Sequence, residues 1–382
     1  MEFTTTPKII TGKGCLKELG KYVPDTLTRM LVVSGKSAVR NGSVDTIREV
    51  LKEKGIETVS YSDITGEPTL EMVENGLKVY KEEQCDGLIG IGGGSPMDAM
   101  KAIAMRSVYT EELSYWMGKP IDRELPFMVC IPTTAGTGSE VTKVTIITDT
   151  VNDVKMLLSG PSLLPDVAIA DPELTYNLPM KATIASGLDA LTHATEAYTS
   201  RKAQPVTDVL CLAAIKKIFV NLPKIVRGEG GEEERAEMLY AAMIAGMGFA
   251  NSSVTLIHGM SRPIGALFHV EHGISNAMLL KVGLGYARDG AVSRFADMAR
   301  EIGAAGAQDN DETAADAYLK AVGDLCDLCG VTTLEEYGLD REQFFALIPK
   351  MAKDAVISGS PANTRRETNE EILEDLYRKL WD

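Results

Sequence analysis

Residues 86–104 have the sequence DGLIGIGGGSPMDAMKAIA, in which a short apolar run is followed by a glycine-rich turn. The run GLIGIG (87–92) has the length and composition of a buried β-strand. Pro96 suits the first turn of a following helix, and the Ser95 hydroxyl is able to cap that helix. The stretch therefore predicts a strand, a tight turn and a helix in direct succession.

The same succession recurs through the first half of the chain. Helical patterns follow at residues 37–55 and near 70–84. The other predicted strands are RMLVVS (29–34), TVSYSD (58–63), FMVCIP (127–132) and DVAIAD (166–171). Short apolar strands separated by helices are typical of βαβ units. We therefore predict an α/β domain of Rossmann-like type with a mostly parallel, doubly wound sheet.

A different pattern begins after Pro179. Apolar residues recur there at spacings of three and four, and convincing strands are absent, which predicts an all-helical (all-α) domain. The predicted helices cover residues 181–199, 206–223, 232–250, 273–302, 311–329, 340–355 and 367–381. Two prolines bracket the change within DPELTYNLP (171–179). We place the boundary there, which gives domains 1–178 and 179–382.

The composition excludes several classes of protein. The net charge of −15 argues against a nucleic-acid partner, which would need a concentrated basic surface. The N-terminus lacks the basic start and apolar run of a signal peptide. No stretch approaches the roughly 20 apolar residues that span a bilayer, so we expect no membrane partner and a soluble, cytoplasmic protein. We interpret Cys326 and Cys329, a CxxC pair, as buried thiols at helical spacing.

Two loops of the first domain are candidates for binding a nucleotide. Gly92, Gly93 and Gly94 allow a phosphate to approach a helix N-terminus closely, although a simple tight turn explains these glycines equally well. The second loop, residues 131–142, offers small polar side chains, namely Thr133, Thr134 and Thr137. Both loops follow predicted parallel strands and would lie at the edge of the sheet where ligands bind in such folds. Together they favour a nucleotide site.

Four side chains of the second domain form a candidate metal site. Asp189 and His193 lie four residues apart on a predicted helix and therefore share one face. In one unbroken helix His258 and His272 would be about 21 Å apart, so a shared ion requires a turn between two helices. Three residues between them argue against an unbroken helix, namely Gly259, Pro263 and Gly265. Taken alone, Asp189 and His193 are also explained as an ordinary pair on a helix surface, and His258 and His272 as core histidines. Taken together, one carboxylate and three imidazoles suit Fe²⁺ or Zn²⁺.

Four segments in this order resemble the iron-containing (group III) alcohol dehydrogenase family, and the likeness covers essentially the whole chain. They are GGGSPMDAMKAIA (92–104), PTTAGTGSEVT (132–142), ATIASGLDALTHATEAYTS (182–200) and HGMSRPIGALFHVEHGISNAMLL (258–280). The resemblance implies a dehydroquinate synthase-like architecture, with a dinucleotide-binding domain, a helical metal-binding domain and a cleft between them. It implies that the metal ligands are Asp189, His193, His258 and His272.

The resemblance also implies which residues contact the cofactor. It places the cofactor phosphates at Gly93, Gly94 and Ser95, with Asp98 nearby. It implies that the threonines of the second loop line the nicotinamide half, and that Lys155 is the cofactor-contacting lysine of the family. Family members strict for NAD usually carry an acidic residue after the first strand, where this chain has Gly35. An acidic side chain would repel the 2′-phosphate of NADP(H). Because Gly35 has none, the sequence allows NADP(H) as well as NAD(H) as the cofactor.

A second departure from the family concerns the substrate. Arg262 stands where many members have a histidine, four residues after His258. A guanidinium cannot act as a base, but it binds carboxylate, sulfonate or phosphate groups well. Arg262 therefore predicts a substrate with an anionic tail, such as a sulfoacetaldehyde or a semialdehyde, unless it pairs with a protein carboxylate such as Glu271. His269 is a candidate for a proton relay or a substrate contact, and equally for a structural role.

The implied activity is a reversible, metal-dependent transfer of a hydride between NAD(P)(H) and a short-chain alcohol or aldehyde. The resemblance suggests a homodimer or a larger homo-oligomer. Three alternatives remain at this point: a neutral short-chain alcohol, 1,3-propanediol or glycerol dehydrogenase, a dehydroquinate synthase-like lyase, and a non-enzymatic metal or nucleotide sensor.

Overall fold

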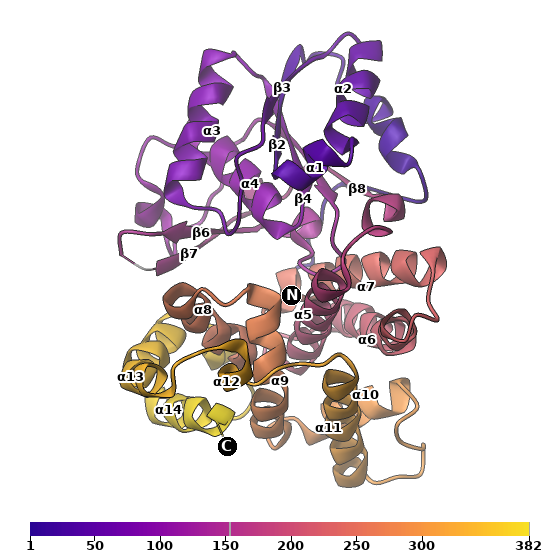
Figure 1. The fold of residues 1–382 in the computed structure, drawn as a ribbon, viewed down its shortest axis with the longest axis vertical. Helices are drawn as coiled ribbons and strands as arrows, with labels where there is room; N and C mark the ends of the chain where they lie inside the picture. The colour runs from indigo at the N-terminus through magenta and orange to yellow at the C-terminus, as the bar shows by residue number, and fades with distance from the viewer. Residues whose placement is uncertain (153, 382) are drawn as a thin grey trace. The chain divides into compact units, whose positions relative to one another are not determined.

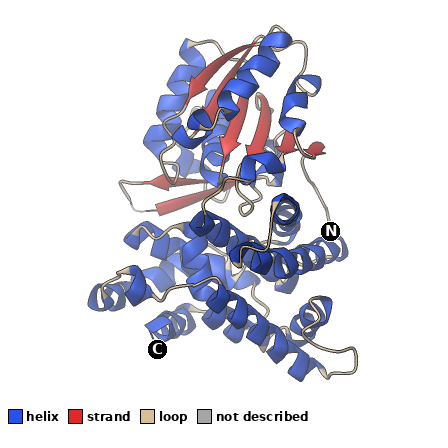
Figure 2. Cartoon of the chain, turned by 45° about the vertical axis from the view of Figure 1, so that its right-hand side comes forward, coloured by secondary structure: helices blue, strands red, loops and turns tan. Residues whose placement is uncertain are grey.

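The computed structural model describes residues 1–152 and 154–381. The chain divides into two compact units. Residues 4–178 form the first unit, and residues 179–382 form the second together with residues 1–3. All strands in the described part of the chain lie in the first unit, and Figure 2 shows the second as helices joined by loops.

The first unit is built around a six-stranded sheet in the order β1-β8-β5-β4-β2-β3. Its strands are β1 (Lys8–Thr11), β2 (Arg29–Ser34), β3 (Glu57–Tyr61), β4 (Gly87–Gly92), β5 (Phe127–Pro132) and β8 (Val167–Ala170). Every pairing in this sheet is parallel. The α/β class predicted from the sequence is therefore confirmed.

Helices cover both faces of the sheet (Figure 1). They are α1 (Lys36–Arg40), α2 (Ser43–Glu53), α3 (Leu70–Glu82) and α4 (Gly94–Val108). Alternate residues of a strand point to opposite faces, so Leu88 packs in one apolar cluster with Ile103 of α4, whereas Ile89 packs in a second with Ile47 of α2. This burial on both sides explains why the central strands are continuously apolar.

Several elements of the first unit differ from the prediction. Strand β1 and the antiparallel hairpin of β6 (Val144–Asp149) and β7 (Val154–Ser159) were not predicted. The helix predicted over residues 37–55 is two helices, because Gly42 adopts a φ of 81° between them. The first strand is short and only partly buried, so it lacks the apolar signal that marked the central strands.

The second unit contains ten α-helices among its described residues (Figure 1). They are α5 (Met180–Thr199), α6 (Pro205–Val226), α7 (Glu232–Ser252), α8 (Leu256–Phe268), α9 (His272–Arg288), α10 (Val292–Glu301), α11 (Asp311–Leu328), α12 (Leu334–Tyr337), α13 (Arg341–Ile357) and α14 (Glu370–Arg378). The all-helical class of this half is confirmed.

One prediction about helix breaks in the second unit is confirmed and one was wrong. A turn separates His258 from His272, at residues 269–271, although the glycines and the proline between them lie inside α8. Gly259 serves packing instead, because a Cβ there would lie 2.6 Å from the ring of Pro361. Conversely, the single helix predicted over 273–302 breaks near Gly290, where a Cβ would lie 2.3 Å from the backbone nitrogen of Arg366.

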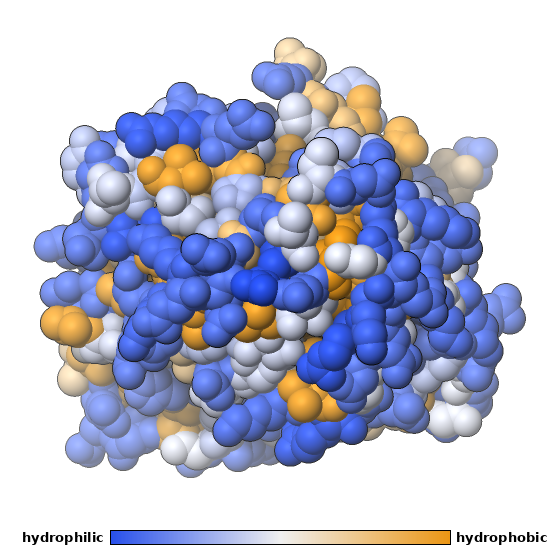
Figure 3. All heavy atoms as spheres, turned by 90° about the horizontal axis from the view of Figure 1, so that it is seen from above, coloured by the Kyte–Doolittle hydropathy of each residue, from blue (hydrophilic) through white to orange (hydrophobic). Residues whose placement is uncertain are grey.

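The remaining expectations concern the surface and the cysteines. No single helix in the described ranges is long and apolar enough to cross a membrane, although α7 and α8, bent by 102°, meet that test as a pair. On the face shown in Figure 3, hydrophilic side chains predominate and apolar ones lie in separate groups. All six cysteines are buried and free, which confirms Cys326 and Cys329 as buried thiols.

Candidate metal centre and nucleotide loops

Helix α5 supplies two of the four predicted metal ligands from its buried face. Asp189 and His193 are one turn apart, and both are almost fully buried. The ring of Phe249 from α7 stacks on the His193 ring with centroids 4.2 Å apart, which restricts the orientation of that imidazole. The His193 ring stacks in turn on that of His258, at 4.4 Å. The local helix and its neighbour therefore aim both ligands into one pocket.

The other two predicted ligands come from the turn between α8 and α9. His258 lies in the first turn of α8, and His272 is the first residue of α9. His269 ends α8 in the left-handed conformation, with a φ of 56°, and reverses the chain direction. This reversal brings the two imidazoles together as the sequence required. The candidate ligand atoms of all four residues lie within 4.8 Å of one another.

The spacing of these atoms fits a tetrahedral ion. Asp189 Oδ1 lies 3.6 Å from His258 Nε2 and 3.7 Å from His272 Nε2, and Asp189 Oδ2 lies 3.9 Å from His193 Nδ1. A tetrahedral centre with bonds of about 2.1 Å would place its ligand atoms roughly 3.4 Å apart. Burial raises the pKa of Asp189, but the three imidazoles outweigh it and hold that pKa far below its usual range. The carboxylate is thus charged and ready to bind a cation.

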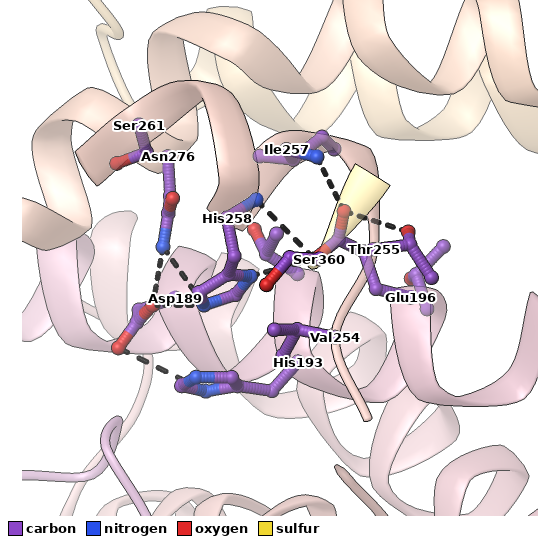
Figure 4. Close-up of polar contacts among 12 residues, drawn as sticks. Asp189, His193, Glu196, Val254, Thr255, Ile257, His258, Ser261, Asn276 and Ser360 are labelled. Atoms are coloured by element: carbon purple, nitrogen blue, oxygen red, sulfur yellow. Dashed lines mark hydrogen bonds and ion pairs between the residues drawn. The ribbon is translucent and has the colours of Figure 1, made fainter. Parts of the chain in front are cut away.

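Glu196 is a functional residue that the sequence reasoning missed. It lies on α5, one turn beyond His193, and is 1% exposed. Its carboxylate accepts hydrogen bonds from His258 Nδ1 at 2.6 Å, from the Thr255 hydroxyl at 2.8 Å and from the backbone of Ile257 at 2.5 Å. One carboxylate therefore caps the start of α8 and leaves His258 Nε2 directed at the site (Figure 4). Its spacing from Asp189 and His193 was a signal that could have identified it.

Asn276 is the second missed residue. It lies on α9, one turn after His272, and is fully buried. Its amide nitrogen lies 2.8 Å from Asp189 Oδ1, and Figure 4 shows it directed at the pocket. The spacing of four residues from a predicted ligand on a helix would have pointed to it.

Arg262 is buried in α8, one turn after His258, and its pKa is lowered by burial to about 10. Its Nη1 donates to the Ser360 hydroxyl at 2.8 Å, and its Nε has no hydrogen-bond partner in the described part of the chain. The alternative prediction that Arg262 pairs with Glu271 was wrong, because Glu271 pairs with Lys181 at 3.4 Å. The guanidinium therefore remains charged at neutral pH without the carboxylate that the alternative supposed.

His269 does not join the cluster of candidate ligands, and its side chain is exposed in the structure. Its left-handed backbone and its bond from its own nitrogen to the Gly265 carbonyl, at 3.1 Å, assign it a structural part in ending α8. Neither observation tests the proton-relay or substrate-contact role.

The two predicted nucleotide loops lie side by side in the first unit. They follow β4 and β5, which are adjacent and parallel. A Cβ on Gly93 would lie 3.5 Å from the Thr134 side chain, and one on Gly94 would lie 3.0 Å from that of Thr137. The Thr133 backbone donates to the Gly92 carbonyl at 2.7 Å. Gly92 adopts a φ of 152°, and a Cβ there would strike Pro96 at 2.6 Å. The sheet thus brings together loops 40 residues apart in sequence, counting from Gly93 to Thr133 (133 − 93).

The capping role predicted for Ser95 was wrong. Helix α4 begins at Gly94, so Gly93 is its N-cap residue, and no side chain caps the helix. The helix therefore begins two residues earlier than expected, and Gly93 and Gly94 lie against the threonines of the other loop. The free N–H groups of this first turn remain directed outward from the helix start, as an anion would require.

Three other predicted cofactor residues have clear local contacts. Asp98 is half-buried, its carboxylate accepts from the Ile146 backbone at 2.9 Å, and desolvation raises its pKa. Lys155 on β7 pairs with Glu67 at 2.5 Å. A Cβ on Gly35 would lie 3.0 Å from the Ile64 carbonyl oxygen, so an acidic side chain there would require the neighbouring backbone to shift.

Family models match both halves of the chain. The iron-containing alcohol dehydrogenase model matches residues 6–172, and that of the C-terminal domain of the Fe-containing alcohol dehydrogenase family matches residues 183–378. The chain belongs to the iron-containing alcohol dehydrogenase family. It is therefore an oxidoreductase, and the family, fold and metal-dependent hydride transfer expected from its sequence are confirmed at this level.

Relatives cover nearly the whole of this alcohol dehydrogenase. Choline dehydrogenase of Bacillus subtilis (strain 168) is 34% identical over 97% of this chain and 92% of its own. NADPH-dependent butanol dehydrogenase of Clostridium saccharobutylicum is 33% identical over 100% and 98%. Among solved structures, a 1,3-propanediol oxidoreductase matches with a TM-score of 0.94 and 32% identity over 99% of both chains. Sulfoacetaldehyde reductase from Bifidobacterium kashiwanohense, in complex with NAD⁺, matches with a TM-score of 0.84 and 28% identity over 99% and 98%.

Proposed function

We propose that Asp189, His193, His258 and His272 hold one divalent ion, Fe²⁺ or Zn²⁺, and that the enzyme reduces short aldehydes with an anionic tail. The buried cluster of one carboxylate and three imidazoles is the observation that carries the metal assignment. When bound, the ion supplies a Lewis acid for the oxygen of the substrate. The four side chains hold it in a buried pocket, and Glu196 keeps the His258 ring oriented.

The first unit would bind the nicotinamide cofactor. Gly93, Gly94 and Ser95 surround the start of α4, where free N–H groups suit a pyrophosphate. Thr133, Thr134 and Thr137 would line the nicotinamide half. Gly35 offers no carboxylate to repel a 2′-phosphate, so we infer that both NADH and NADPH serve. Asp98 would support this site by holding the β6–β7 hairpin, and Lys155 would reach the cofactor after leaving Glu67.

Arg262 would recognise the anionic tail of the substrate. It is the residue one turn from the ligand His258, it is buried, and one of its nitrogens lacks a hydrogen-bond partner among the described residues. An anion would supply that partner and offset the buried charge. The likeness to sulfoacetaldehyde reductase supports this substrate class. His269 would accept or deliver the proton, and its exposed ring suits exchange with water.

An assay with one anionic and one neutral aldehyde tests whether Arg262 binds the anionic tail of the substrate. Arg262→Ala and Arg262→Lys are compared with wild type on sulfoacetaldehyde and on neutral propanal. Loss of charged hydrogen bonds of about 1.5–3 kcal/mol should lower kcat/KM for the anionic aldehyde about 10- to 150-fold in the alanine variant. The neutral aldehyde should change by less than about threefold. Equal losses for both substrates would contradict the proposal.

Removal of a ligand tests the metal centre itself. His258→Ala should lose bound iron or zinc and lower kcat by more than about 1,000-fold, because the ion would stabilise the charge that develops on the substrate oxygen. Metal content per folded protein, measured by mass spectrometry, accompanies the rate. Full activity in a metal-free preparation would refute the proposal.

A second candidate activity is the oxidation of a neutral alcohol. It is favoured by the 34% identity with 1,3-propanediol dehydrogenases of Citrobacter freundii and Klebsiella pneumoniae. In that case Arg262 would stay bonded to Ser360. In the same assay the kcat/KM for neutral diols would exceed that for sulfoacetaldehyde.

We further propose a homodimer or larger homo-oligomer located in the cytoplasm. The six free, buried cysteines suit a reducing compartment, where disulfides are rare. Sedimentation of the purified enzyme tests the assembly, and a monomer at micromolar concentration would contradict it.

A further inference from the structure

The amide nitrogen of Asn276 contacts three of the four candidate ligands at once. It lies 2.8 Å from Asp189 Oδ1 and 3.1 Å from His258 Nε2 (Figure 4). It also lies 3.2 Å from His272 Nε2. The side chain is fully buried. These are the same three ligand atoms whose spacing fits a tetrahedral ion. Asn276 thus faces the position that an ion would share.

The chemistry of these contacts defines what Asn276 is able to do. The amide nitrogen only donates and carries two hydrogens, so it donates one to Asp189 Oδ1 and shares the other between the Nε2 lone pairs of His258 and His272. An inward Oδ1 would instead face the carboxylate oxygen of Asp189, and two acceptors repel each other. The lone pairs that accept from Asn276 are those that would bind an ion. Because N–H groups cannot point at a cation, the contacts to the imidazoles and the bound ion are alternatives.

The other end of the amide carries a second observation. Asn276 Oδ1 is buried and has no hydrogen-bond partner in the described part of the chain. A buried acceptor without a partner is unfavourable by about 1–3 kcal/mol. The inward contacts of the amide nitrogen are therefore what holds the side chain in this orientation. The ordinary explanation, a core asparagine with both ends satisfied, does not fit.

We propose that Asn276 is a placeholder for the ion. In the ion-free enzyme its amide donates to Asp189 and the two imidazoles and keeps their lone pairs directed inward. When the ion binds, it replaces the amide at the imidazoles, and Asn276 gives up those contacts. This inference rests on the proposed metal centre and makes Asn276 a positioning residue that stabilises the ion-free state selectively.

Thermal unfolding with and without ion tests the placeholder. Wild type, Asn276→Ala and Ser275→Ala are each stripped with a chelator and then reloaded with Co²⁺, whose visible absorption reports the ligand set. Ser275 is a matched control, because it is also buried on α9 but bonds to Ser261 rather than to a ligand. The midpoint of Asn276→Ala should fall more without ion than with Co²⁺, whereas Ser275→Ala should lower both midpoints equally.

The same linkage predicts a gain in affinity. If only the ion-free state loses stability, Asn276→Ala should bind Co²⁺ about 2- to 10-fold more tightly than wild type in a chelator competition. Asn276→Asp, which keeps the shape but replaces the donor with a carboxylate, should bind more than about tenfold more tightly and serves if the alanine variant does not fold. Weaker Co²⁺ binding by both variants, or equal midpoint losses in both states, would overturn the placeholder. If wild type itself binds no Co²⁺, the proposed metal centre fails instead.

Discussion

Two buried polar clusters, one in each unit, contrast in how their charges are balanced. In the first unit the ammonium of Lys101 donates to the carbonyls of Ser139 and Thr142 at 2.7 Å and to that of Val144 at 3.1 Å. In the second unit a charged carboxylate and three imidazoles face one another. The first cluster contains its cation as part of the chain. The second gathers the ligand types that bind a divalent ion.

The difference separates a structural cluster from a functional one. Burial lowers the pKa of Lys101, yet its donors are matched by oxygens of the second nucleotide loop and of Val144, the first residue of β6. A closed arrangement of this kind stabilises a loop and has no coordination left to offer. The carboxylate and three imidazoles of the second cluster are the ligand types that bind a divalent ion, and an exchangeable cation completes such a set. Substitutions should therefore affect stability in one cluster and metal binding in the other.

The largest expected effect comes from a substitution that disrupts the first cluster. Lys101→Met removes the cation from several buried acceptors and should lower the free energy of unfolding by about 3–5 kcal/mol. Urea unfolding measures this loss, and metal content per folded molecule should not change. Lys78→Met, which removes an exposed ammonium, is the control and should shift stability by less than about 0.5 kcal/mol. An unchanged midpoint in Lys101→Met would show that the cluster is not structural.

An intermediate effect depends on pH. Burial raises the pKa of Glu140, a neighbour of Lys101, from 4.5 to about 7. Because the folded-state pKa lies above the unfolded one, unfolding releases a proton, and stability falls as the pH rises from 4.5 through 7. Glu140→Gln should therefore match wild type near pH 4.5 and exceed it by up to about 3 kcal/mol at pH 8.

The control for this comparison is Glu82→Gln, whose side chain is exposed. It should show no such divergence between the two pH values. If Glu140→Gln is less stable than wild type at pH 8, its carboxylate is paired with Lys101 more strongly than burial disfavours it, and the two clusters are more alike than we infer.

The smallest expected effect concerns the metal affinity of the second cluster. Glu196→Gln replaces the charged acceptor of His258 Nδ1 and should weaken metal affinity about 10- to 100-fold, or about 1.4–2.8 kcal/mol. Competition with a chromophoric chelator measures the change. Thr192→Val, a buried α5 variant whose hydroxyl bonds only its own helix, should bind metal as wild type does. Equal affinity in Glu196→Gln would mean that Glu196 only caps α8.

Sequence patterns predicted some parts of these clusters and missed others for identifiable reasons. Asp189 and His193 share a helix, so their spacing alone placed them on one face. His258 and His272 needed a turn between two helices, which the sequence predicted without its position, because glycines and a proline also occur where a neighbouring segment packs closely, as Pro361 does on Gly259. Glu196 and Asn276 had helical spacing to ligands, but polar residues at such spacing are common on any helix.

The sequence by itself determined the class of each half, through alternating apolar strands and helices before Pro179 and three- and four-residue spacing after it. It also determined which residue types were available for a metal, since only four histidines exist and three cluster with Asp189. Only the tertiary structure decided that Glu196 orients His258, that Asn276 faces three ligands and that Arg262 has no partner in Glu271. Local spacing is set by backbone geometry, whereas contacts between α5, α8 and α9 depend on how whole helices pack.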